Sequence, residues 1–136
     1  MISKSITYID YNGNERTETH WFNMNDAEIM DMELSITGGM SKMIEQIIEA
    51  KDTPALMKVF KDLILKSYGV KSPDGKRFIK SDEITLEFTQ TEAYVKLYTT
   101  LATNTKEAIE FINGVIPNKK DSNNNVTTMP VAASNN

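Results

Sequence analysis

The chain has 136 residues, of which 40% are hydrophobic and 25% are charged, and its formal net charge is −4 at pH 7. These proportions are typical of a globular protein, and no run of about 18 apolar residues is present that could form a membrane-spanning helix. Cysteine is absent, which excludes disulfides, thiolate zinc sites and cysteine nucleophiles. The first residues lack the apolar core of a signal peptide, so we expect a cytoplasmic protein.

Charge is distributed unevenly along the chain. Residues 15–52 hold nine acids and three bases (net −6), residues 53–80 hold seven bases and two acids (net +5), and residues 81–113 hold six acids and two bases (net −4). Oppositely charged patches can guide head-to-tail association, which would give a weak homo-oligomer. The alternative is that these charges only form solvated helix faces.

The N-terminal segment predicts a β-hairpin over residues 5–22. Two stretches rich in β-branched and aromatic residues flank Asn12-Gly13, a pair typical of a type I′ turn. An isolated hairpin is only marginally stable in water, so this ribbon must pack on helices or pair with another chain. Trp21 and Phe22 are expected to pack where the ribbon meets the rest of the protein.

Helical patterns follow over residues 25–116. The predicted helices begin at Asn25, Met40, Asp52 or Thr53, Ser81, Thr91, and Asn104 or Thr105. Asn25 and Glu28 match a capping box, and Pro54 suits a first helical turn, where its missing N–H is not needed. Gly69 lies where a C-terminal glycine ends a helix, and the last helix is expected to end at Gly114.

The remaining segments complete the predicted fold. Residues 72–75 form a turn by composition, and residues 76–80 are either a short extended piece or a loop. Residues 118–136 are mostly Asn, Ser, Thr, Ala and Lys without a periodic apolar pattern, which predicts a disordered tail. We therefore expect an α+β fold, with one domain over residues 1–117 in which the hairpin packs on a bundle of four to five short helices.

No set of residues for catalysis or metal binding is recognisable. His20 is the only histidine, so neither a zinc site nor a Ser–His pair is expected, and we interpret it as a structural or exposed strand residue. The sequence contains no EF-hand series and no phosphate-binding loop. Pairs of acids at helix starts are explained by the helix dipole. We expect a non-catalytic binding protein without a cofactor or a metal.

Methionine is the more informative binding feature. Six of the eight methionines lie between Met24 and Met57. Methionine adapts to irregular partners, so these helices could form a groove for a partner helix; the alternative is that they fill a small core. Residues two apart cannot share one helix face, so Met30 or Met32 should point outward. The candidate partner-binding residues are Met30, Met32, Met40, Met43, Ile47 and Met57.

A second candidate is a basic segment with interleaved aromatic residues. Its basic residues are Lys71, Lys76, Arg77 and Lys80, and its aromatic residues are Tyr68 and Phe78. Single-strand nucleic acid binders combine cations and aromatic rings in this way. The chain as a whole is acidic and contains no nucleic-acid-binding motif, which argues against nucleic acid as the partner.

Several segments, in one order from about residue 6 to residue 117, resemble a known family. They include TYIDYNGNERTE at 7–18, FKDLILKSYG at 60–69, DGKRFIK at 74–80 and FINGVIP at 111–117, with shorter matches at 22–24, 32–35, 38–39, 90–94 and 101–103. The family is that of the tail assembly chaperones of long-tailed phages of Gram-positive bacteria. The ordered set, rather than any single motif, carries the resemblance.

The resemblance implies a protein that binds the tape measure protein, a long and largely helical rod, keeps it soluble and promotes polymerisation of the tail tube around it. The implied partners are the tape measure protein, the tail tube protein and a frameshifted longer form of the chain itself. Such chaperones work in the host cell cytoplasm and are not expected in the mature virion. The alternative is a small phage-encoded regulatory protein that binds nucleic acid or a host protein through residues 71–80.

Overall fold

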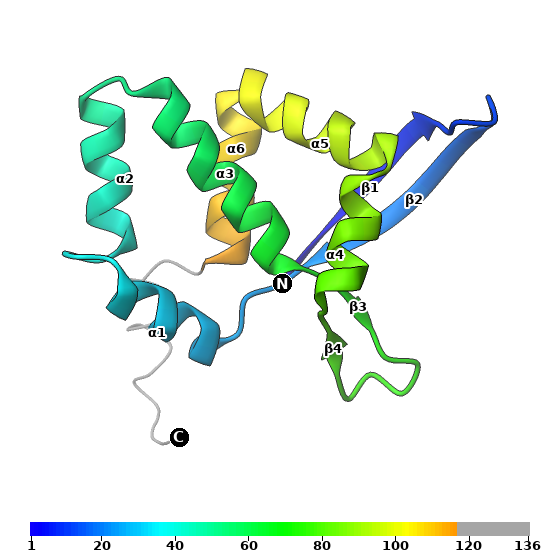
Figure 1. Cartoon of the computed structure of the whole chain (residues 1–136), viewed down its shortest axis with the longest axis horizontal. Helices are drawn as coiled ribbons and strands as arrows, with labels where there is room; N and C mark the ends of the chain where they lie inside the picture. Colours follow the sequence, from blue (N-terminus) through cyan, green and yellow to red (C-terminus); the bar gives the residue numbers. More distant parts are fainter. Residues whose placement is uncertain (117–136) are drawn as a thin grey trace.

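The computed structural model describes residues 1–116, which form a four-stranded sheet and six helices (Figure 1). In chain order the elements are β1 (Ile2–Ile9), β2 (Glu15–Phe22), α1 (Asp26–Ser35), α2 (Met40–Glu49), α3 (Thr53–Ser67), β3 (Tyr68–Lys71), β4 (Phe78–Ile79), α4 (Asp82–Thr89), α5 (Glu92–Thr103) and α6 (Thr105–Val115). The predicted α+β class and N-terminal hairpin are confirmed, and the described residues form six helices where four to five were expected. Residue 117 and the tail expected over residues 118–136 lie outside the described residues.

The hairpin is longer than predicted, and its turn is of a different type. β1 and β2 pair antiparallel from Ile2 opposite Phe22 to Ile9 opposite Glu15. At the turn, the Asp10 N–H donates to the Asn14 carbonyl and the Gly13 N–H donates to the Asp10 carbonyl. Gly13 alone in this loop has a positive φ, whereas a type I′ turn needs two such residues. The prediction of a type I′ turn is therefore wrong.

The Asp10 side chain explains this turn. Its Oδ1 accepts the N–H groups of Asn12 and Asn14, both at 2.9 Å, and its Oδ2 accepts from Arg16 Nε at 2.6 Å. The hydrogen bond from Arg16 is the main reason why the pKa of Asp10 is lowered. Side-chain bonding of this kind fixes a turn conformation that the Asn-Gly pair alone does not specify.

Two further strands extend the hairpin into a sheet with the order β1-β2-β3-β4. Trp21 pairs with Gly69 between β2 and β3, and Lys71 pairs with Phe78 between β3 and β4. Gly69 is thus a strand residue, and the prediction that it caps α3 is wrong, since α3 ends at Ser67. A Cβ at Gly69 would lie only 2.5 Å from Phe78 Cε2, so the close approach of β4 requires the glycine.

The core lies where the hairpin meets α3, α4, α5 and α6. Phe22 is completely buried there, with its ring 5.3 Å from that of Phe111. Tyr68 stacks on Phe88 at a centroid distance of 4.1 Å. These rings join β2, β3, α4 and α6, which confirms the expected packing role of Phe22. Trp21 is half-buried beside β3.

The first two helices join this core only at its margin, through Met32 of α1 and Met40 of α2. The capping box of Asn25 and Glu28 is present at the start of α1. α2 packs mainly on α3, whereas α1 makes few contacts with any other element. Figure 1 shows α2 on the side of α3 that is remote from the hairpin. None of the helices within residues 1–116 is long and apolar enough to cross a membrane.

Candidate functional site

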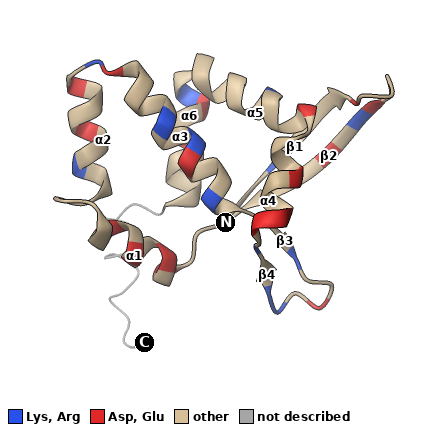
Figure 2. Cartoon of the chain, in the orientation of Figure 1, with Lys and Arg blue, Asp and Glu red and all other residues tan. Residues whose placement is uncertain are grey.

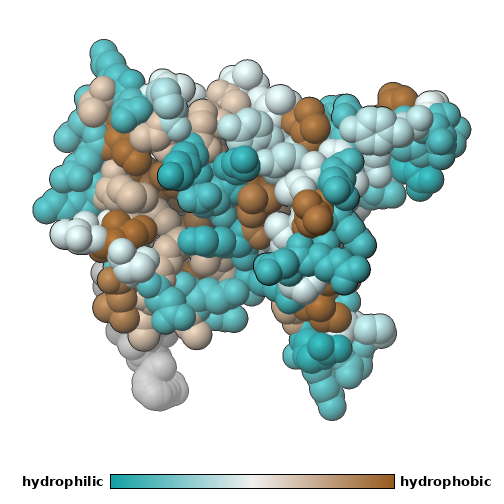
Figure 3. Space-filling view, viewed as in Figure 1, coloured by the Kyte–Doolittle hydropathy of each residue, from teal (hydrophilic) through white to brown (hydrophobic). Residues whose placement is uncertain are grey.

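An apolar groove of about 370 Å³ lies between α1, α2 and α3. Figure 3 shows apolar atoms, in brown and tan, in the space between α2 and α3. The residues that line the groove are Met32, Ser35, Ile36, Met40, Met43, Ile47, Ala55, Lys58, Val59, Asp62, Leu63 and Lys66. Its volume is within the range of about 300–1,000 Å³ typical of ligand-binding clefts.

The helical repeat of α2 explains one wall of this groove. Met40, Met43 and Ile47 follow one another at intervals of three and four residues, so they share a helix face. The N-terminus of α2 is held near α1 because the Glu33 carboxylate accepts the Met40 N–H at 2.9 Å. That bond brings Met32, on α1, to the same hollow.

The structure brings together four of the six candidate partner-binding residues. Met32, Met40, Met43 and Ile47 all line the groove, whereas Met30 and Met57 do not. Met30 is 62% exposed and Met32 only 7% exposed, as expected for residues two apart on one helix. Met40 is only 6% exposed. It therefore belongs to the core and also forms part of the floor of the groove.

Sequence reasoning missed the charged residues on the α3 wall of the groove. Lys58, Asp62 and Lys66 are exposed and follow one another at four-residue spacing. Figure 2 shows basic and acidic residues along α3. Within residues 1–116, none of the three forms an ion pair within 4 Å. The four-residue spacing of these three charges within one predicted helix was the sequence signal that could have identified them.

The four residues of the predicted basic patch do not form one free surface. Lys71 Nζ lies 3.7 Å from the centroid of the Trp21 ring, and Lys80 Nζ donates to Glu28 Oε1 at 2.8 Å. Lys76 and Arg77 are exposed in the loop between β3 and β4. Two of the four cations are thus bound within the chain.

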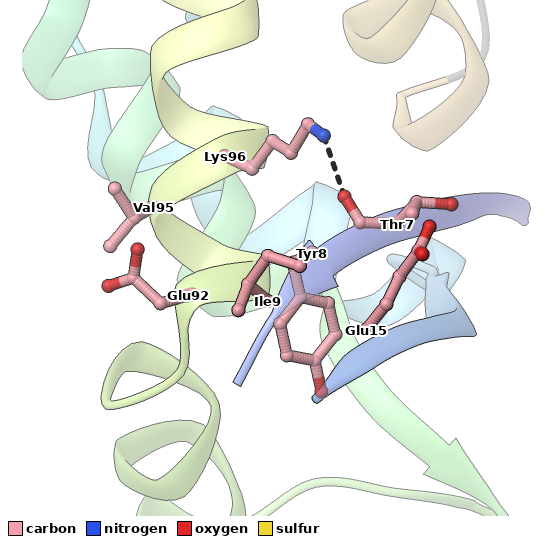
Figure 4. Close-up of a pocket in the computed structure, with 7 residues that line it drawn as sticks. All are labelled: Thr7, Tyr8, Ile9, Glu15, Glu92, Val95 and Lys96. Carbon is pink, nitrogen blue, oxygen red and sulfur yellow. Dashed lines mark hydrogen bonds between the residues drawn. The ribbon is translucent and has the colours of Figure 1, made fainter. Parts of the chain in front are cut away.

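A second hollow, of about 440 Å³, lies between the hairpin and α5 (Figure 4). Lys96 reaches from α5 to donate to the Thr7 carbonyl at 2.6 Å, and Tyr11 Oη donates to Glu92 Oε2 at 2.8 Å. The Lys96 bond occupies a carbonyl on β1, an edge strand of the sheet, and such cover protects an edge from pairing with another chain. These internal bonds make the hollow a poorer docking site than the groove.

His20 lies among aromatic rings rather than in a reactive cluster. Its ring centroid is 5.2 Å from that of Phe88 and 6.3 Å from that of Tyr68. Burial lowers the pKa of His20, and the nearby Glu18 carboxylate opposes this effect. Its Nε2 is buried and has no hydrogen-bond partner among the described residues. Across residues 1–116, no group of three or more His, Asp or Glu side chains is placed to hold a metal ion.

Apolar grooves with polar rims are a common form of docking surface for a partner helix. A family model described as phage tail assembly chaperone matches residues 1–132. Because this match covers nearly the whole sequence, the chain belongs to the phage tail assembly chaperone family. No curated protein and no solved structure matches it.

Proposed function

We propose that the chain binds the tape measure protein through the groove between α1, α2 and α3, keeps it soluble and promotes polymerisation of the tail tube around it. Membership of a chaperone family supports a role in tail assembly without catalysis. The single observation that carries the binding mode is the groove itself, with four clustered candidate residues. The proposed setting is the host cytoplasm, for a long-tailed phage of Gram-positive bacteria, and the protein does not remain in the mature virion.

The dimensions of the groove suit side chains that project from a helix. Its α3 wall runs from Ala55 to Lys66, which corresponds to about 16 Å, or three turns, at 1.5 Å per residue. A hollow of about 370 Å³ is too small for a whole helix but accepts apolar side chains spaced along one face. An amphipathic helix docks in a groove in this way.

Further contacts belong to the same proposal. Met30 and Leu34 are 62% and 80% exposed on α1, and they form an apolar strip outside the groove. This strip, together with Met57, is a proposed secondary contact for the tape measure protein. The tail tube protein and a frameshifted longer form of the chain are the other proposed partners, and the alternating charge blocks would support weak self-association.

The groove can be tested with two neighbouring substitutions on α2. Ile47 lines the groove, whereas Ile48 is exposed and does not line it. We expect Ile47→Lys to reduce capture of the co-expressed tape measure protein at least about tenfold, because it places a charge in an apolar contact. Ile48→Lys, which adds the same charge outside the groove, should capture it normally. Equal capture by both variants in a quantitative pull-down would contradict the binding mode.

The alternative function, a regulator that binds nucleic acid or a host protein through residues 71–80, has less support. Lys71 lies over Trp21 and Lys80 pairs with Glu28, so only part of the segment offers free cations. We therefore do not propose it as a second function.

A further inference from the structure

The charged wall of the groove has a pattern that a partner can match. Lys58, Asp62 and Lys66 give the order basic, acidic, basic along α3. Residues four apart lie on one side of a helix, so the three charges form a row of about 12 Å beside the apolar floor. The floor next to this row is formed by Val59 and Leu63, which are buried.

The opposite wall carries no comparable charge. The α1 and α2 residues that line the groove are Met32, Ser35, Ile36, Met40, Met43 and Ile47, all of them uncharged. A docked helix would therefore meet apolar side chains on one flank and three alternating charges on the other. Charges at the rim of a docking surface select partners and fix their register more than they add affinity.

We propose that the groove selects an amphipathic helix that carries an acid, a base and an acid at four-residue spacing beside its apolar stripe. This inference rests on the proposed function and specifies the class of tape measure segment that the groove accepts. The acids would pair with Lys58 and Lys66, and the base with Asp62. The row reads the same in both directions, so it fixes the register of the bound helix and not its direction.

The pattern favours a different protein, not a second copy of this chain, as the occupant. Nowhere do the 136 residues place an acid, a base and an acid at positions i, i+4 and i+8. A second copy would leave at least one of the three wall charges without a partner, and an unpaired charge that loses water on docking is costly. A segment with an acid, a base and an acid at four-residue spacing would pair with all three wall charges and avoid this cost.

Two synthetic helical peptides of about 18 residues test the inference with the full chain. Both carry the same Leu and Met stripe; one has Glu-Lys-Glu and the other Lys-Glu-Lys at four-residue spacing on one flank, with compensating residues on the far face to equalise net charge. At low salt we expect the chain to bind the Glu-Lys-Glu peptide about tenfold more tightly by calorimetry. The preference should shrink at high salt, because exposed charges are screened.

Charge reversal in the protein provides the decisive comparison. The variant Lys58→Glu/Asp62→Lys/Lys66→Glu should prefer the Lys-Glu-Lys peptide. Lys61→Glu is the matched control, since it lies on the same helix outside the groove and changes the net charge by the same −2; it should keep the preference of the original chain. The inference is overturned if the original chain does not discriminate, or if the triple variant keeps the original preference.

Failure of this inference is distinguishable from failure of the proposed function. If neither peptide binds but the tape measure protein is still captured in an Ile47-dependent manner, the charge rule is wrong and the proposed function stands. If the tape measure protein is not captured at all, the proposed function fails, whereas discrimination between the peptides would still support the charge rule.

Discussion

His20 is enclosed by Phe88 and Tyr68 at the end of β2, and its side chain is only 12% exposed. Burial lowers its pKa from the ordinary value of 6.5. As pH falls below about 6.5, the unfolded chain therefore takes up a proton that the folded chain does not. A state that binds more protons is favoured by acid, so this site makes the folded protein less stable from pH 6.5 down towards the lowered pKa.

Replacing His20 with phenylalanine should remove this contribution. His20→Phe keeps an aromatic ring against Phe88 and Tyr68. It removes both the titration and the buried Nε2, which has no hydrogen-bond partner within residues 1–116. We expect the free energy of unfolding, measured in urea, to fall between pH 7.5 and pH 5.5. This fall should be smaller for the variant than for the original chain. Thr19→Val, at the preceding exposed position, should retain the original pH dependence. If the free energy of unfolding falls by the same amount in His20→Phe as in the original chain, groups other than His20 cause the pH dependence.

Helix α6 makes a close contact with β1 at Gly114. Alanine normally stabilises a helix by about 1 kcal/mol relative to glycine. A Cβ at Gly114 would overlap Ile2 Cγ2, and overpacking in a tight contact costs about 1–3 kcal/mol. The overpacking cost exceeds the helix gain, so we expect Gly114→Ala to destabilise the protein by up to about 2 kcal/mol, the reverse of the usual sign.

Ile2, the residue that Gly114 contacts, provides the control for this prediction. Ile2→Ala removes the methyl group that the new Cβ would meet, so Gly114→Ala should cost less in the Ile2→Ala background than in the original chain. The four urea unfolding curves form a double-mutant cycle whose coupling energy isolates the contact. Stabilisation by Gly114→Ala alone would mean that α6 does not approach β1 this closely.

Helix caps and glycines differ in how much of their structural role the sequence reveals. Helix starts were predictable because caps are local: Asn25, Ser81, Thr91 and Asn104 each accept a backbone N–H three residues ahead. The predicted end of the last helix at Gly114 agrees with the structure to within about one residue, since α6 ends at Val115. The prediction that Gly69 ends α3 is wrong because its contact with Phe78 on β4 leaves no signal in the residues next to the glycine. The short strand β3 was missed for a similar reason, since it forms by pairing with β2. β4 agrees with the extended alternative that the sequence left open for residues 76–80.

Part of the lining of the groove was predictable from the sequence. The clustering of methionines and the 3–4 spacing of Met40, Met43 and Ile47 identified one wall, because that pattern lies within a single helix. Which residues of α1 and α3 complete the groove depends on how three helices pack together, so Met57 was included and the charged row on α3 was not. A periodic charge pattern becomes interpretable only when the structure shows what lies beside it.

The attachment of α1 and α2 to the rest of the molecule predicts where the fold opens most easily. α1 buries only Met32 and α2 only Met40, whereas α3 buries Val59, Phe60, Leu63, Ile64 and Ser67. Segments with little buried apolar surface open at lower free energy than the core. We therefore expect α3 to form a firm wall of the groove, and α1 and α2 to form a wall that can adjust.

Amide hydrogen exchange followed by mass spectrometry tests this difference. We expect peptides from α1 and α2 to exchange at least about tenfold faster than those from α3, because the first two helices can open without exposing the core around Phe22. Addition of the tape measure protein should slow exchange in α2 much more than in α4 or β4, since a ligand stabilises the closed form of the segment it contacts. Equal protection of α2 and α3 in the free protein would contradict the adjustable wall. If the tape measure protein slowed exchange at β4 and not at α2, its binding site would lie outside the groove.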